Sequence, residues 1–203
     1  MPIPSGDRDG NVHARGIGIV GTMARGDLQS YLAYVRPHYE AKDAAHDFSH
    51  ILRIGDRIAE LERGLTVNDR PRLHFLAAWH GLADRIAGGS WFADATRAWL
   101  TEDGWDDDAI DTAYVALVRH TTSPVTVEEQ IIHDAAALEL LGAFGIAQAF
   151  ATGGAEGQSC EEIMTSYERR LEKADFKTPR GRVLAPGGRD YARSFLARLR
   201  SEL

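Results

Sequence analysis

Apolar residues recur every three or four positions in nearly every segment that follows Asp27. This spacing is typical of helices that bury one face, whereas the strict alternation of half-buried strands is absent. Helices that have no sheet to cover must pack on each other. The sequence therefore predicts an all-α protein, with a loose N-terminal arm over residues 1–26 and one helical domain, a helical bundle, over residues 27–203.

Capping residues and glycines mark the ends of several predicted helices. Asp27 is suited to cap a first helix, which Pro37 interrupts, and a second helix over about residues 48–63 ends at Gly64. A Ser or Thr followed three residues later by Glu is a capping-box pattern, and such patterns begin at Thr126 and Ser159. Both patterns precede apolar stripes and therefore predict helix starts.

Two further segments bear on function. A third helix is predicted from about Asn68 to the glycine pair 88–89, and it carries His80 and Asp84. Near the C-terminus, the stretch KTPRGRVLAPGG (residues 177–188) is predicted to be a loop because it is rich in Gly and Pro. A final helix then places Tyr191 and Phe195 four residues apart.

Charge and cysteine content disfavour several classes of partner. The formal net charge is −7 and the 23 Lys and Arg residues are spread among acids, so no basic surface for nucleic acid is expected. The single cysteine, Cys160, cannot form an internal disulfide, which fits a reducing compartment and a cytoplasmic location. No apolar run approaches the roughly 20 residues of a membrane-spanning helix. Neither nucleic acid nor membrane is an expected partner, and the sequence does not set the oligomeric state.

Five of the eight histidines lie at predicted helix ends or on inner helix faces. Imidazole together with carboxylate suits transition metals such as Zn²⁺, Mn²⁺ and Fe²⁺, whereas all-oxygen sites suit Mg²⁺ and Ca²⁺. For any one histidine, the alternative is an ordinary hydrogen-bonded core or surface residue. The five are His46, His50, His80, His120 and His133.

Four segments in the same order resemble the HD-domain superfamily of metal-dependent phosphohydrolases. They are HDFSHILRI, LVRHTTSP, IIHDAAALELLGAFGIAQAF and the tail KTPRGRVLAPGGRDYARSFLARLRSEL, and the resemblance covers roughly residues 27–203. It implies the fold of that superfamily. It also implies that His50 is the first metal ligand, that Asp134 is the last, and that His120 lies near the active site.

The departure from the family lies in the signature itself. The segment LAAWHGLAD resembles the family stretch that supplies an adjacent His and Asp, but here the pair reads His80-Gly81, and Ala136 stands where a second acid is common. Asp84 lies four residues after His80, so on an unbroken helix the two side chains share a face and can chelate one metal. Alternatively, Gly81 breaks the helix and Asp84 points elsewhere, for instance into a salt bridge.

The resemblance also implies roles for the other candidates. A divalent Mn, Fe, Co, Ni or Zn held by His50, His80, Asp134 and, in the altered form, Asp84 supplies hydroxide for attack on phosphorus. Asp134 orients that nucleophile, and His120 protonates the leaving oxygen or binds phosphate. The candidate contacts to substrate phosphate are His46, Arg53, Lys177 and Arg189.

Three functions follow from these observations. The first is hydrolysis of a small phosphate ester, such as a nucleotide or a phosphorylated metabolite, because an acidic protein disfavours long polyanions. The second is a catalytically silent HD protein that binds a ligand or partner, which the His80-Gly81 pair favours. The third is an enzyme of changed chemistry on the same fold.

Overall fold

The computed structural model describes residues 26–40 and 48–203, and all regular elements in these ranges are helical, which confirms the predicted class. The predicted arm lies outside the described residues except for its last residue, and His46 also lies outside them. In chain order the elements are α1 (Leu28–Val35), a 3₁₀ turn (Arg36–His38), α2 (Phe48–Leu61), α3 (Arg70–Trp79), a 3₁₀ turn (His80–Leu82), α4 (Ala83–Ala87), α5 (Trp91–Glu102), α6 (Asp107–Arg119), α7 (Val127–Glu139), α8 (Gly142–Ala155), α9 (Cys160–Lys173) and α10 (Pro179–Arg200).

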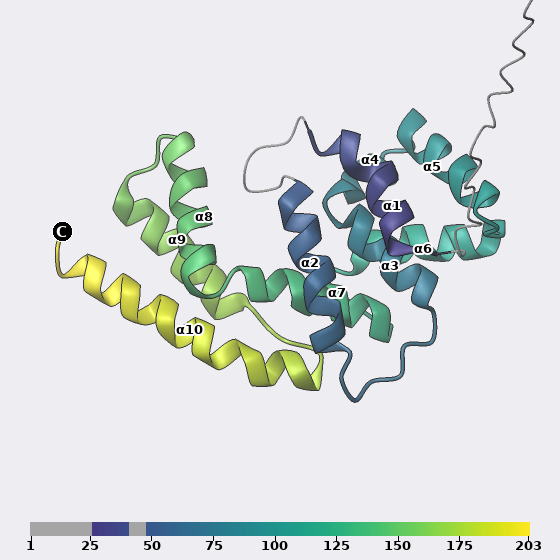
Figure 1. Cartoon of the computed structure of the whole chain (residues 1–203). Coiled ribbons are helices and arrows are strands. Elements are labelled where there is room, and N and C mark those ends of the chain that lie inside the picture. Colours follow the sequence, from purple (N-terminus) through teal and green to yellow (C-terminus); the bar gives the residue numbers. More distant parts are fainter. Residues whose placement is uncertain (1–25, 41–47) are drawn as a thin grey trace, which may run out of the picture.

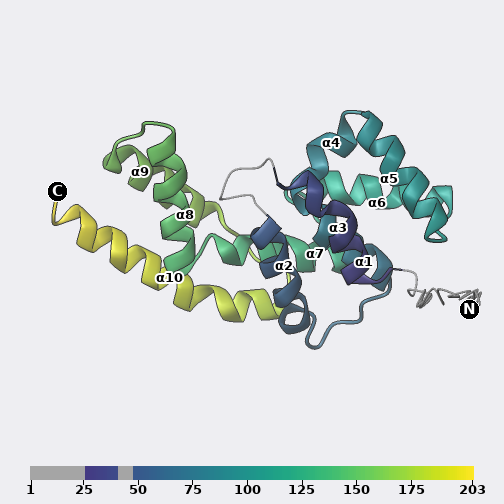
Figure 2. The ribbon, with the colours of Figure 1, turned by 45° about the horizontal axis from the view of Figure 1, so that its top comes forward.

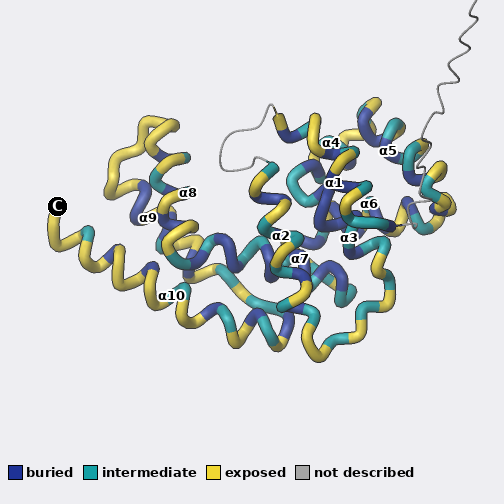
Figure 3. The backbone as a smooth tube through the Cα atoms, in the orientation of Figure 1, coloured by how far each residue is buried: buried dark blue, intermediate teal, exposed yellow. Residues whose placement is uncertain are grey.

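Helix α7 connects two ends of the fold. Helices α4, α5 and α6 lie at one end, and α8, α9 and α10 lie at the other, in both views (Figures 1 and 2). Helix α7 packs against α2, α3, α8 and α10, while α3 also packs against α1 and α6. Much of α3 and α7 is buried, whereas α10 exposes a long face (Figure 3). The core therefore centres on α3 and α7.

Most predicted helix starts are confirmed. The side chain of Asp27 accepts a hydrogen bond from the Ser30 N–H at 2.9 Å and caps α1. Ser159 and Glu162 form the full reciprocal capping box at α9. At α7 the Thr126 side chain caps the helix, but the carboxylate of Glu129 binds Arg119 and the Val125 N–H instead of closing the box. These local patterns predict helix starts because they depend only on nearby residues.

The third predicted helix is broken. Helix α3 ends at Trp79, and the turn His80–Leu82 separates it from α4. Within this turn the Gly81 N–H donates to the Tyr39 hydroxyl at 3.1 Å. His80 and Asp84 therefore belong to different elements, and the prediction of one unbroken helix is wrong.

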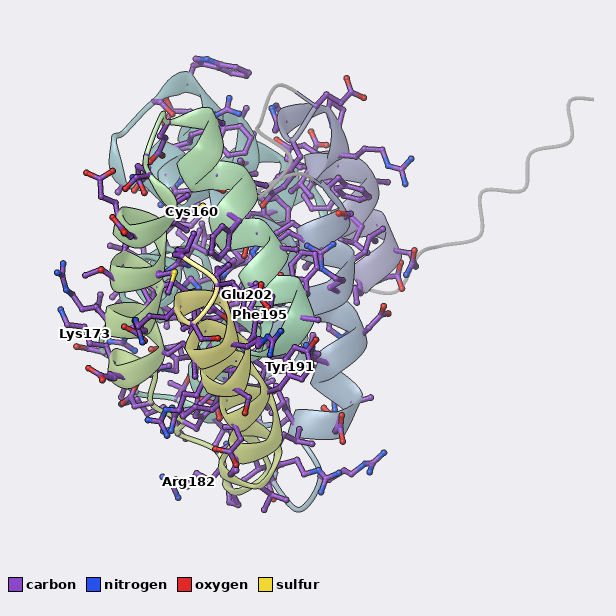
Figure 4. The ribbon with its side chains drawn as sticks, turned by 90° about the vertical axis from the view of Figure 1, so that its left-hand side faces the viewer. Cys160, Lys173, Arg182, Tyr191, Phe195 and Glu202 are labelled. Carbon is purple, nitrogen blue, oxygen red and sulfur yellow. The ribbon has the colours of Figure 1, made fainter. Side chains whose placement is uncertain are left out.

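The predicted loop over residues 177–188 is also wrong, because most of it forms the first turns of α10. Thr178 caps this helix by accepting a hydrogen bond from the Gly181 N–H at 2.9 Å, and Pro179 occupies its first turn, where proline is favourable. Pro186 is tolerated inside the helix. Figure 4 shows Tyr191 and Phe195 along the same helix, where both are exposed.

Helix α7 carries four buried carboxylates, and each one holds a different neighbour. Glu128 accepts hydrogen bonds from the Asn68 and Asp69 N–H groups before α3, and Glu129 forms a bidentate pair with Arg119 of α6. The other two are Asp134, which holds the start of α10, and Glu139, which holds α2.

The three buried glutamates of α7 remain ionised. Burial raises the pKa of Glu128, Glu129 and Glu139, but hydrogen bonds from backbone and cationic groups outweigh it, so each pKa lies below its usual value near 4.5. Because each carboxylate binds a different element, α7 fixes the relative positions of α2, α3, α6 and α10.

In the described part of the chain, no single helix is both long and apolar enough to cross a bilayer. Only α7 and α8 taken together meet the length and composition test, and a bend of 72° separates them.

Candidate functional site

Three histidines from distant parts of the chain meet beside α3. The ring centroids of His50 and His80 are 5.3 Å apart, and those of His80 and His120 are 4.8 Å apart. His50 comes from the first turn of α2, His80 follows the end of α3, and His120 caps the end of α6. His50 and His120 are buried, while His80 is half-buried. We call these three residues the histidine cluster.

Glu139 fixes His50 and Arg53 from the end of α7. The Glu139 Oε2 atom lies 2.6 Å from His50 Nδ1, and Oε1 accepts a hydrogen bond from Arg53 Nε at 2.6 Å. A carboxylate of lowered pKa can only accept, so His50 Nδ1 carries a proton in this contact. The Arg53 guanidinium also lies over the Phe144 ring, 4.1 Å from its centroid, which immobilises it. Arg53 is therefore committed to Glu139 and Phe144.

His120 and His80 form a chain of hydrogen bonds. His120 Nδ1 donates to the Leu117 carbonyl at 2.6 Å, because a carbonyl can only accept. Burial lowers the pKa of His120 below its usual value near 6.5, so the ring is neutral at pH 7 and its Nε2 accepts. His80 Nδ1 lies 2.6 Å from that atom and donates to it. Both nitrogens of His120 are thus engaged within the protein.

A tyrosine occupies the space beside Gly81. A Cβ atom built on Gly81 would lie 2.9 Å from Tyr39 Cε1 and 3.3 Å from the Tyr39 hydroxyl. Tyr39 is buried, and its hydroxyl donates to the Ala78 carbonyl at 3.0 Å while it accepts from the Gly81 N–H. Burial raises the pKa of this hydroxyl above its usual value near 10, so it stays protonated. A larger residue at 81 therefore requires Tyr39 to move.

Asp134 holds the start of α10. Its Oδ1 accepts from the Lys177 N–H at 2.8 Å, and its Oδ2 accepts from the Thr178 N–H at 2.8 Å and the Thr178 hydroxyl at 2.7 Å. The side chain is fully buried. The unpaired N–H groups at a helix start attract a negative charge. Both oxygens of Asp134 are thus used within the fold.

The remaining predicted site residues lie elsewhere. Asp84 is exposed on α4 and pairs with neither Arg85 nor Arg189. The Lys177 ammonium pairs with Asp175, and Arg189 donates to the Ala174 carbonyl at 2.5 Å. Of the proposed metal ligands, the structure brings together His50 and His80. Neither Asp134 nor Asp84 joins them in a geometry for a metal, and no group of three or more His, Cys, Asp or Glu side chains within residues 26–40 and 48–203 is arranged to hold one.

Two residues of this region were not predicted. Glu139 lies five residues after Asp134, and only its place at the end of an acid-bearing apolar stripe signals it. Tyr39 has no sequence signal, because it meets Gly81 only through the packing of the segment after α1 on α3. The roles predicted for the individual site residues stay predictions.

Comparison with known proteins gives matches among solved structures. No protein-family model matches the chain, and no curated protein does. A protein from Listeria innocua is similar with a TM-score of 0.69 and 20% identity, over 86% of this chain and 94% of that one. Bacillus subtilis YpgQ in complex with ADP is similar with a TM-score of 0.67 and 18% identity, over 87% and 94%. An HD-superfamily hydrolase from Bacillus thuringiensis is similar with a TM-score of 0.67 and 20% identity, over 89% and 98%. The chain therefore has the HD-domain fold.

Proposed function

We propose that this protein uses the HD-domain fold to bind a small phosphorylated molecule and does not catalyse metal-dependent phosphate hydrolysis. The observation that carries the proposal is the contact between Tyr39 and Gly81. A buried tyrosine ring stands where the family resemblance expects the side chain of the signature aspartate. Without that aspartate the site lacks an anionic ligand that the metal of the family requires.

The other carboxylates near the histidine cluster do not replace the missing one. Both oxygens of Asp134 bind the start of α10, and Glu139 is held by His50 and Arg53. Releasing either carboxylate would leave buried polar groups unsatisfied, which costs about 1–3 kcal/mol for each group. The residues present therefore do not fit the metal site of the family.

The histidine cluster retains features that suit a ligand. His80 is half-buried beside two buried imidazoles. One neighbour of this fold, YpgQ, has been solved with ADP, which makes an adenine nucleotide the first ligand to test. Because His80 Nδ1 donates to His120, a phosphate oxygen would bind at His80 Nε2, which requires the His80 ring to take up a second proton when the ligand binds.

A metal-bound hydrolase is the second candidate, and the orientation of His50 favours it. A histidine that donates one ring N–H to a carboxylate presents its other nitrogen, as metal-binding histidines do. Hydrolysis of p-nitrophenyl phosphate and of nucleotides with added Mn²⁺, Co²⁺, Ni²⁺ or Zn²⁺ separates the two candidates. We expect no turnover above that of a His50→Ala variant. Metal-dependent turnover that disappears in this variant would establish the hydrolase instead.

Binding is tested separately by calorimetry with ADP in the absence of metal. We expect wild type to bind ADP and His80→Ala to bind it about tenfold more weakly, because one charge-assisted or neutral hydrogen bond is lost. A matched control is His74→Ala, because His74 is also half-buried but binds the Gly26 carbonyl away from the cluster. Equal binding by wild type and His80→Ala would remove the cluster from ligand recognition.

A further inference from the structure

A second cluster of side chains lies on the other side of the turn His80–Leu82, where α4 meets the start of α5. The Arg85 guanidinium lies over the Phe92 ring, 4.2 Å from its centroid, and 6.0 Å from the centroid of Trp91. His38 packs edge-on against Phe92 with a centroid distance of 4.5 Å. We call Arg85, Trp91, Phe92 and His38 the arginine-tryptophan cluster. The proposed function of the histidine cluster does not involve these four residues.

The backbone holds this cluster in place. Gly89, with a φ of 59°, forms the tight turn between α4 and α5. The Ser90 hydroxyl donates to the Arg85 carbonyl at 2.7 Å, which ties the end of α4 to the start of α5. Arg85 and Phe92 therefore face each other across a short connection, and their stacking does not depend on a distant segment.

Arg85 has unused capacity to bind an anion. Stacking on Phe92 uses the face of the guanidinium and leaves its N–H edge available. The one N–H contact of Arg85 in the described ranges is to His38 Nδ1 at 3.4 Å, and no carboxylate there pairs with Arg85. By contrast, Arg53, Arg97 and Arg119 each pair with a carboxylate. Among the residues that the structure describes, Arg85 is thus a positioned cation without a counter-charge.

His38 adds a neutral polar group. Its Nδ1 accepts from Arg85, because guanidinium can only donate. Burial and the nearby Arg85 charge both lower the pKa of His38 below its usual value near 6.5. The net charge of the cluster at pH 7 is therefore the single charge of Arg85, which matches a singly or doubly charged anionic group better than a polyanion.

Trp91 provides an aromatic surface for a planar ring. It is the most exposed large hydrophobic side chain of the described residues, with 69% of its surface accessible, and it stands on the first turn of α5. An exposed tryptophan beside an unpaired arginine combines a stacking platform with a phosphate or carboxylate partner, as in proteins that bind bases. Isolated exposed apolar residues are common, so the neighbouring arginine is what makes this one informative.

We propose that the arginine-tryptophan cluster binds a planar aromatic ligand that carries one phosphate group, with the ring on Trp91 and the phosphate on the N–H edge of Arg85. This site is distinct from the histidine cluster, and the inference does not depend on the proposed function. It predicts that neither half of the ligand binds well alone, because each half engages only one of the two groups.

The test uses AMP as the probe, with adenosine and inorganic phosphate as its two halves, measured by calorimetry on the full chain. Wild type is expected to bind AMP at least tenfold more tightly than either half. Arg85→Gln is expected to weaken AMP binding by about ten- to hundredfold through loss of charged hydrogen bonds. Trp91→Ala is expected to weaken it by about tenfold through loss of stacking. Arg193→Gln, an exposed arginine on α10, is the matched control and is expected to bind AMP like wild type.

Two additional variants keep the outcome decisive. Arg85→Lys keeps the charge but loses the planar fork, so it is expected to bind AMP less tightly than wild type and to retain the helical circular dichroism signal. Unchanged AMP affinity in Arg85→Gln, or absence of AMP binding by wild type, would overturn the proposal. Loss of AMP binding in His80→Ala alone would also overturn it and would place the nucleotide in the histidine cluster.

Discussion

The turn at Gly81 and helix α7 differ in how they deprive the histidine cluster of carboxylates. At Gly81 there is no acidic side chain, and Tyr39 fills the adjacent space. On α7 four acidic side chains are present and buried. Glu128, Glu129 and Asp134 bind groups outside the cluster, and Glu139 is held by Arg53 and by the Nδ1 atom of His50. Acidic residues near histidines therefore do not make a metal site when their oxygens already accept hydrogen bonds from other parts of the fold. The same residues near the histidines would be present with or without a metal site. The hydrogen-bond partners of the carboxylates decide between the two.

The largest expected effect comes from Asp134. Asp134→Ala removes a buried acceptor and leaves the Lys177 and Thr178 N–H groups without a partner. We expect the free energy of unfolding to fall by about 3 kcal/mol, measured by urea denaturation. The control is Asp190→Ala, an exposed acid on α10, with an expected change within about 0.5 kcal/mol. Loss of bound metal without loss of stability in Asp134→Ala would reverse the assignment.

Substitution at Gly81 tests whether Tyr39 blocks a side chain at this position. Gly81→Asp places new atoms against Tyr39, so we expect it to lower the free energy of unfolding by about 2 kcal/mol without a gain in metal affinity. Gly64→Asp provides a glycine control without any neighbour within 4 Å, although its φ of 80° adds backbone strain of its own. A stable Gly81→Asp protein that binds Zn²⁺ tightly would show that the Tyr39 ring moves away from residue 81 at little cost in stability.

Glu139 offers a smaller and more specific test. Glu139→Gln keeps the shape but removes the charge that holds His50 and Arg53, so stability should fall by about 1.5 kcal/mol. Because the pKa of Glu139 lies below its usual value, this contribution is present above pH 4.5 and is lost as the pH falls through the folded-state pKa. The difference in unfolding free energy between wild type and variant should therefore shrink in acid. A difference that stays constant from pH 7 to pH 3 would exclude an ionised Glu139.

His120 gives the smallest expected effect. Its pKa is lower in the folded protein than its usual value near 6.5, so the unfolded chain binds more protons as the pH falls. Stability is thus full above about pH 6.5 and declines as the pH falls from there to the folded-state pKa. His120→Gln should flatten the unfolding free energy between pH 7 and pH 5, measured by denaturant titration. His38→Gln should flatten it less, because His38 is less buried. If the unfolding free energy changed equally with pH in wild type and in His120→Gln, the buried imidazole of His120 would not be neutral.

Local patterns predicted much of the fold. The caps at Asp27 and Ser159 depend on hydrogen bonds within one turn, so the sequence around them is sufficient. The first turns of α10 were missed because Gly and Pro usually end helices. Here the Thr178 cap and the distant carboxylate of Asp134 support the helix start, and the second of these contacts spans 44 residues. Tertiary contacts of this kind override local preference.

The candidate site was less predictable than the fold. The family resemblance placed His50 and His80 in one site, and the structure brings their rings together. The engagement of Asp134 with Thr178, and of Tyr39 with Gly81, depends on packing between segments about 40 residues apart. Residue identity predicts that an acid can bind a metal, but only the fold decides which way its oxygens point.

The most direct test of the account is the transition-metal content of untagged protein, measured by elemental mass spectrometry after incubation with Mn²⁺, Co²⁺, Ni²⁺ or Zn²⁺, beside a His50→Ala variant. We expect no stoichiometric metal in either protein, because the carboxylates of α7 are committed to the fold and Tyr39 occupies the space beside Gly81. Stoichiometric metal in wild type that is lost in His50→Ala would contradict it.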